Sequence, residues 1–138
     1  MPTVLMIATT SVLLSGLLIA WIVPQHSRRR HARRDLLWLV GQDQYEYTVL
    51  DLRPPGEFAA GHIPQAINVS PDHILSYLPT ENMFERIYTC GRTASMAKRA
   101  SRILGRTGYF NVESVGAFRH WRGPVEESQS AEVPSIAP

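Results

Sequence analysis

The only cysteine of the chain, Cys90, follows a short apolar run and precedes a short polar loop. Arg86 to Thr89 predicts a strand and Thr93 to Arg106 predicts a helix, so the thiol would lie where a helix begins. The positive end of that helix and the backbone N–H groups of the loop would lower the pKa of the thiol. We therefore expect a reactive thiolate at neutral pH. The alternative is a buried structural cysteine at the end of a strand.

The loop after Cys90 offers groups that suit an anionic sulfur or an oxyanion. Gly91 allows the backbone to pass close to the sulfur. Arg92 is a cation that would lower the pKa of the thiol further. The residues expected to bind substrate are Gly91, Arg92, Thr93, Ala94 and Ser95.

A second polar segment follows the β-rich run Tyr47 to Leu52. Asp51 is expected to cap the turn after this strand, and Arg53 and Glu57 are close enough in sequence to form an ion pair. Each charge taken alone can equally be a solvated surface residue, and His62 alone is more often structural than catalytic.

Several classes of site are excluded by what the sequence lacks. One cysteine cannot form an internal disulfide or a cysteine-rich zinc site, and the five histidines show no metal-binding spacing. A phosphate-binding loop needs a second glycine and a Gly-Lys-Ser/Thr ending, and the segment Gly91 to Lys98 has neither. The sequence also has no glycine-rich fingerprint for a dinucleotide. We expect no metal and no cofactor. The net charge of +2 is too small to indicate a nucleic-acid partner.

Strand-like and helix-like segments alternate from residue 35 to residue 122. The expected elements, in chain order, are helix Asp35 to Val40, strand Tyr47 to Leu52, turn Glu57 to Ala60, strand Ala66 to Val69, helix Pro71 to Leu78 with Ser70 as cap, the strand and helix flanking Cys90, strand Phe110 to Val115 and helix Ala117 to Arg122. This order predicts an α/β fold with a small parallel sheet flanked by helices. Active sites of such sheets lie at the carboxyl ends of the strands, which points to Asp51 and Cys90.

The amino-terminal part has a different character. Val4 to Val23 is apolar and long enough to cross a bilayer core of roughly 30 Å, which predicts a transmembrane anchor in residues 1–25. The alternative, a cleaved secretory signal, is disfavoured because no basic residue precedes the run and no Ala-x-Ala follows it. Five arginines at positions 28–34, within a basic juxtamembrane segment 26–34, place the domain 35–125 on the cytoplasmic side of a single-pass protein. Residues 126–138 predict a disordered tail.

The segment 49–69 and the Cys90 loop together resemble the rhodanese family. The resemblance rests on Asp-x-Arg at Asp51, a Glu-Phe pair at Glu57, the run Gly-His-Ile-x-x-Ala-x-Asn from Gly61, and Gly116 to Trp121 near the end, and it covers roughly residues 33 to 125. It implies a single-domain sulfurtransferase in which Cys90 takes up sulfane sulfur as a persulfide and passes it to cyanide, a small thiol or a protein. In such a domain the residues that brace the site would be Asp51, Arg53, Glu57 and His62.

The loop departs from the family pattern of Cys-x-x-Gly-x-Arg. Gly91 comes directly after Cys90, and Ser95 stands where the family has arginine. Arg92 is the expected source of the missing cation. A non-catalytic rhodanese-like binding module at the membrane is the second interpretation. A cysteine phosphatase or arsenate reductase ranks last, because Met96 stands where that chemistry needs an arginine.

Overall fold

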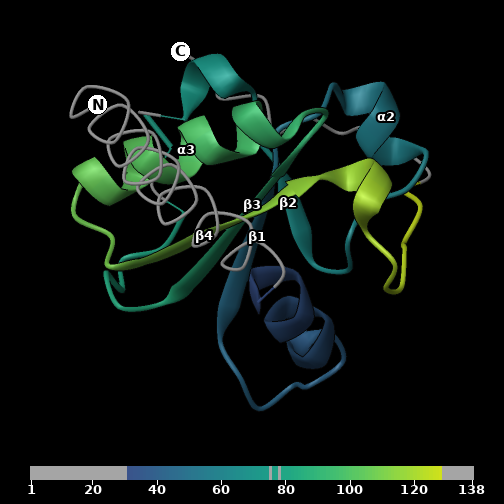
Figure 1. The fold of residues 1–138 in the computed structure, drawn as a ribbon, viewed down its shortest axis with the longest axis horizontal. Coiled ribbons are helices and arrows are strands. Elements are labelled where there is room, and N and C mark those ends of the chain that lie inside the picture. Colours follow the sequence, from purple (N-terminus) through teal and green to yellow (C-terminus); the bar gives the residue numbers. More distant parts are fainter. Residues whose placement is uncertain (1–30, 75, 78, 129–138) are drawn as a thin grey trace, which may run out of the picture.

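The computed structural model describes residues 31–74, 76–77 and 79–128 of the 138. Four parallel strands form one sheet in the order β2-β1-β3-β4 (Figure 1). The strands are β1 Tyr47–Asp51, β2 Ala66–Asn68, β3 Arg86–Gly91 and β4 Asn111–Ala117. The helices are one over residues 31–39, α2 Pro55–Ala59 and α3 Ala94–Arg106, with 3-10 turns η1 Pro71–His73 and η2 Phe118–His120. The predicted α/β fold with a small parallel sheet is confirmed.

Two apolar clusters cover the two faces of the sheet, because successive side chains of a strand point to opposite sides. The helix over residues 31–39 packs on one face and α3 on the other (Figure 1). Buried residues of the first cluster include Ala32, Leu36, Leu39, Val49, Tyr88, Cys90, Val115 and Trp121. Those of the second include Leu50, Leu52, Ile74, Ile87, Ala100, Leu104 and Tyr109. The alternation of Ile87 and Tyr88 between the clusters places Cys90 on the side away from α3.

The first described helix begins before the predicted Asp35. Residues 31–34 are helical, and Ala32 is only 1% exposed. Leu36 and Leu39 continue the same buried stripe at helical spacing. Part of the segment predicted as a juxtamembrane linker thus packs on the sheet.

Two predicted helices are shorter in the structure. In the segment predicted as helix Pro71 to Leu78, the described residues form only the 3-10 turn Pro71–His73, and the side chain of Ser70 makes no capping bond. Of the residues that the structure describes in this segment, only Ile74 is buried, and so short a helix is marginal without an apolar face to pack. Ala117 to Arg122 contains only the turn Phe118–His120, because β4 extends through Ala117.

Both ends of the chain carry predictions outside the described residues. The predicted span Val4 to Val23 lies in residues 1–30, and in the described ranges no helix is long and apolar enough to cross a bilayer. Most of the predicted tail 126–138 also lies outside them. Its first residues contact the domain: Glu126 and His62 exchange backbone hydrogen bonds of 2.8 and 2.9 Å, and the Ser128 amide donates to the carbonyl of Ala59 at 3.1 Å.

Candidate functional site

Cys90 lies near the carboxyl end of β3, in register with Asp51 of β1 and Gly116 of β4. The parallel pairing brings Asp51 and Cys90 side by side, as the strand order predicted. Strand β3 continues through Gly91, so Cys90 belongs to the strand and not to the loop. Its side chain is 1% exposed and packs in the first apolar cluster.

This environment keeps the thiol of Cys90 protonated at neutral pH. Burial raises its pKa to about 12, and the negative charge of Asp51 acts in the same direction. Against these effects, the charges of Arg53 and Arg33 and a hydrogen bond from the Gly91 backbone lower the pKa of Cys90. Desolvation outweighs all of them, because a thiolate loses its hydration in an apolar site. The prediction of a lowered pKa is therefore wrong.

The loop between β3 and α3 holds its polar groups in local contacts. Thr93 caps α3, with its hydroxyl oxygen accepting from the Met96 amide at 3.2 Å. The Ser95 hydroxyl lies 3.5 Å from that of Thr93. Arg92 forms an exposed ion pair with Glu57, which lowers the pKa of that carboxyl. Arg92 is thus engaged by α2, and it is not among the cations that act on the pKa of Cys90.

The Met96 side chain fills the space beside Gly91. A Cβ atom at Gly91 would lie 3.2 Å from Met96 Sδ and 3.3 Å from its Cγ. Because Gly91 has no side chain, the Met96 side chain can pack against its backbone.

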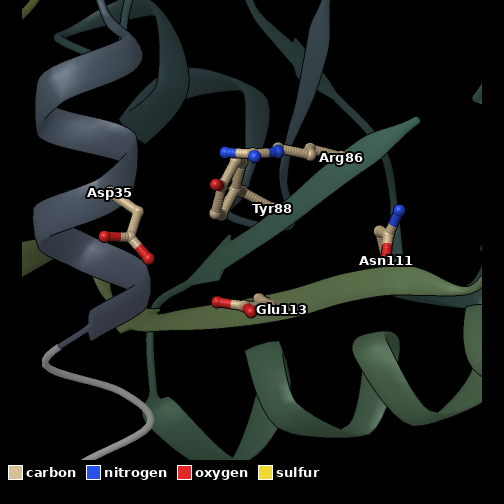
Figure 2. Close-up of a pocket in the computed structure, with 5 residues that line it drawn as sticks. All are labelled: Asp35, Arg86, Tyr88, Asn111 and Glu113. Atoms are coloured by element: carbon tan, nitrogen blue, oxygen red, sulfur yellow. The ribbon is translucent and has the colours of Figure 1, made fainter. Parts of the chain in front are cut away.

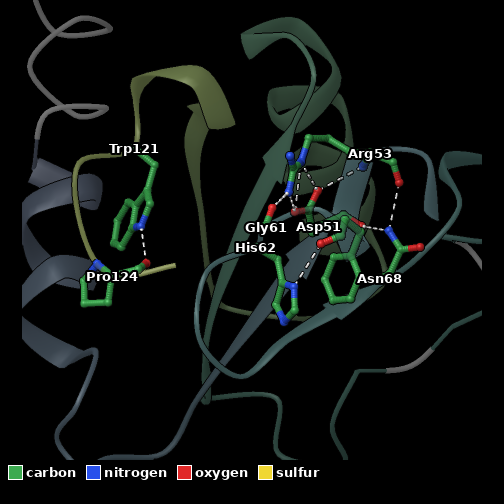
Figure 3. A network of polar contacts seen from close by, with 8 residues as sticks. Asp51, Arg53, Gly61, His62, Asn68, Trp121 and Pro124 are labelled. Atoms are coloured by element: carbon green, nitrogen blue, oxygen red, sulfur yellow. Dashed lines mark hydrogen bonds and ion pairs between the residues drawn. The ribbon is translucent and has the colours of Figure 1, made fainter. Parts of the chain in front are cut away.

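Asp51 and Arg53 form a buried ion pair next to Cys90 (Figure 3). Arg53 Nε donates to both Asp51 carboxylate oxygens at 3.1 and 3.0 Å, and Nη2 donates to Oδ2 at 2.7 Å. The Arg53 amide donates to Oδ1 at 3.0 Å, which is the predicted cap of the turn. The guanidinium also donates to the Gly61 carbonyl at 2.6 Å and stacks 3.6 Å above the Phe118 ring. The predicted pairing of Arg53 with Glu57 is wrong, because Asp51 faces Arg53 inside the turn.

His62 and Asn68 brace the same turn (Figure 3). His62 Nδ1 lies 3.0 Å from the Phe58 carbonyl oxygen, and the two rings stack at 3.9 Å. Asn68 Nδ2 donates to the carbonyls of Asp51 at 3.0 Å and Arg53 at 2.8 Å. Asn68 was not singled out from the sequence, although it closes the Gly-His-Ile-x-x-Ala-x-Asn run. These contacts fix the backbone beside Cys90.

The structure adds Arg33 to the surroundings of Cys90. Its Nε donates to the Val115 carbonyl at 2.6 Å, so the side chain crosses from the first helix to the end of β4. The sequence placed Arg33 in a run of arginines directed at lipid headgroups. Only the periodicity of Ala32, Leu36 and Leu39 could have indicated that this part of the run belongs to the domain.

A separate polar pocket of about 300 Å³ lies at the other end of β3 (Figure 2). It is lined by Asp35, Arg86, Tyr88, Asn111 and Glu113. Burial raises the pKa of Tyr88, and Glu113 adds to the rise. Arg86 begins β3 and Cys90 stands near its end, so this pocket is distinct from the Cys90 site.

Comparisons with known proteins agree on one domain type. The family model described as a rhodanese-like domain matches residues 35–123. A protein of Candida albicans, adenylyltransferase and sulfurtransferase UBA4, is 30% identical over an alignment of 96 residues that covers 63% of this chain and 22% of that protein. The chain therefore spans about a fifth of the length of this curated relative.

Solved structures share the fold. The Alr3790 protein from Anabaena has a TM-score of 0.62 and 21% identity, with 69% of this chain and 80% of that chain covered. A rhodanese-related protein from Thermoplasma volcanium has a TM-score of 0.57 and 23% identity, covering 68% and 93%. A structure described as rhodanese with anions from E. coli has a TM-score of 0.52 and 21% identity, covering 59% and 99%.

Proposed function

Because the chain belongs to the rhodanese-like domain family, we propose that it is a sulfurtransferase in which Cys90 carries sulfane sulfur as a persulfide. One observation supports this above all: the only thiol of the chain lies at the carboxyl end of an inner strand, beside Asp51, with the Gly91 N–H as hydrogen-bond donor. That edge is where parallel sheets place their active sites. The relation to a protein named as a sulfurtransferase supports sulfur transfer at the level of the family.

The proposed reaction has two displacements at sulfur. The Cys90 thiol first loses its proton to solvent. Its sulfur then attacks the sulfane sulfur of a donor such as thiosulfate, a Cys90 S–S bond forms, and sulfite leaves with the electron pair of the broken bond. An acceptor such as cyanide or a thiolate then attacks the outer sulfur and regenerates the Cys90 thiolate. The E. coli neighbour described with anions supports an anionic donor.

A second candidate function is a non-catalytic rhodanese-like binding module. The observation that favours it is the burial of Cys90, whose side chain is 1% exposed and whose pKa is raised to about 12 by burial. In that case the thiol is a core residue, and the surface around the loop contacts a partner.

Intact-mass measurement separates the two candidates. After incubation with thiosulfate or polysulfide, the full chain in detergent should gain the mass of one sulfur atom, and cyanide should remove it. Cys90→Ser should gain nothing, since it removes the only thiol. A wild-type chain that stays unmodified with both donors would favour the binding module.

We further propose that residues 4–23 anchor the chain as a single membrane span, with the domain in the cytoplasm. This proposal rests on the apolar run and the arginines that follow it. Since Arg33 is directed into the domain, headgroup contact is left to Arg28, Arg29, Arg30 and Arg34. Protease added to sealed right-side-out cells should leave the domain intact and should degrade it only after the membrane is permeabilised. Digestion in sealed cells would overturn the assigned orientation.

A further inference from the structure

Arg33 reaches the Cys90 end of the sheet from a helix that precedes the whole sheet in sequence. Its Nε donates to the Val115 carbonyl at 2.6 Å. Its Nη2 lies 3.1 Å from the point where Gly116 would carry a Cβ atom. Gly116 is the register partner of Cys90 in β4. The guanidinium is therefore held against the strand that borders the thiol.

Gly116 makes room for this guanidinium. Its φ angle of +88° lies in the left-handed region, which favours glycine. The Cβ of Ala94, the first residue of α3, lies 3.8 Å from the same point at Gly116. Arg33 is thus next to the start of α3.

Further positive charge gathers around Arg33. Desolvation lowers the pKa of the exposed His120, and the charges of Arg119, Arg33 and Arg122 lower it further, in that order. Arg92 is paired with Glu57, and Arg53 with Asp51. Among the described residues, no carboxylate forms an ion pair with Arg33, so its Nη groups keep their capacity for an anion.

We propose that Arg33 is a substrate-binding residue that holds the anionic end of the sulfur donor beside Cys90. Arg33 supplies the positive charge that is missing from the loop, where Ser95 stands in place of the family's arginine. The sulfur donors that it would bind are small oxyanions that carry a sulfane sulfur, such as thiosulfate. This inference rests on the proposed function for its substrate. In the transfer, Cys90 sulfur bonds to the sulfane sulfur, the bond to the oxyanion sulfur breaks, and sulfite leaves next to Arg33 with both electrons.

The test compares an anionic and an uncharged reagent at the same thiol, so that it does not depend on sulfur transfer. Iodoacetate and iodoacetamide alkylate Cys90 in the full chain, and the ratio of their rates cancels the thiolate fraction. Arg33→Gln should lower the ratio of iodoacetate to iodoacetamide rates by about tenfold, as expected for a hydrogen-bonded charge. Arg33→Lys should keep most of the ratio.

Arg34→Gln is the matched control. Arg34 is the next residue of the same helix and is exposed, with Nη2 3.0 Å from His31 Nδ1. It should leave the ratio unchanged. An equal fall for Arg34→Gln, or no fall for a folded Arg33→Gln, would overturn the proposal.

Two further measurements keep the outcome clear. If Arg33→Gln does not fold, the wild-type chain is tested with sodium sulfate, and sodium chloride of equal ionic strength is the control. Sulfate should lower the rate of alkylation by iodoacetate more than the rate of alkylation by iodoacetamide. Equal lowering of the two rates would overturn the anion site. The thiosulfate concentration for half-maximal sulfur gain should rise about tenfold to a hundredfold in Arg33→Gln. A wild-type chain that gains no sulfur, yet keeps the Arg33-dependent rate ratio, would overturn the sulfurtransferase function and leave the anion site standing.

Discussion

At pH 8, Cys90 should react with iodoacetamide on the order of a thousandfold more slowly than free cysteine, whose pKa is about 8.5. The reason is that burial raises the pKa of the Cys90 thiol to about 12, and only the thiolate is nucleophilic. A higher pH produces more thiolate. The rate should therefore climb about tenfold per pH unit from pH 8 to pH 11, without a plateau.

The measurement is the fraction of alkylated full chain by intact mass over time at each pH. The same chain unfolded in urea is the control, because its only thiol then titrates near the ordinary value. A plateau below pH 9 in the folded chain would restore the thiolate that the sequence predicted. It would mean that the loop opens to solvent around Cys90.

Removal of the buried carboxylate in Asp51→Ala should cost about 3–5 kcal/mol in the free energy of unfolding. Asp51 and Arg53 are 1% and 7% exposed, and the substitution leaves the Arg53 guanidinium buried without its anion. Domains of this kind have about 5–15 kcal/mol in total, so the variant should be close to unfolding. Urea denaturation at neutral pH, followed by circular dichroism, gives the value.

Glu57→Gln provides the comparison for this prediction. It breaks an ion pair whose side chains are 60% and 40% exposed, and solvent screens such pairs. Its denaturation midpoint should stay near that of the wild type. A loss of stability as large as that of Asp51→Ala would contradict the prediction. It would mean that the exposed Arg92–Glu57 pair stabilises the fold as much as the buried Asp51–Arg53 pair does.

The sequence predicted the parts of this fold that depend on local pattern. The apolar spacing predicted α3 to within one residue, since the helix begins at Ala94 after the cap Thr93. The alternation of strands and helices indicated that parallel pairing would bring Asp51 and Cys90 together. The environment of Cys90 could not be read in this way. Its burial depends on the first helix, on β4 and on Trp121, which are all distant from Cys90 in sequence.

Charged partners were the least predictable feature. Arg53 forms an ion pair with Asp51 and not with Glu57 because of the turn geometry. Glu57 forms an ion pair with Arg92, which lies in another loop. In the sequence, nothing distinguishes Arg33 from the neighbouring arginines, but in the structure it donates a hydrogen bond to a carbonyl in β4. A run of like charges says nothing about which member turns inward.

The contact between Arg33 and Val115 also has a consequence for synthesis. The two residues are 82 positions apart, and ribosomes add roughly 5–20 residues per second. The first helix therefore waits several seconds for β4 to emerge, with Leu36 and Leu39 still uncovered. Nascent chains with uncovered apolar surface are prone to aggregate. We expect chaperone binding to ribosome-bound chains to begin with this helix and to end once Trp121 has left the exit tunnel.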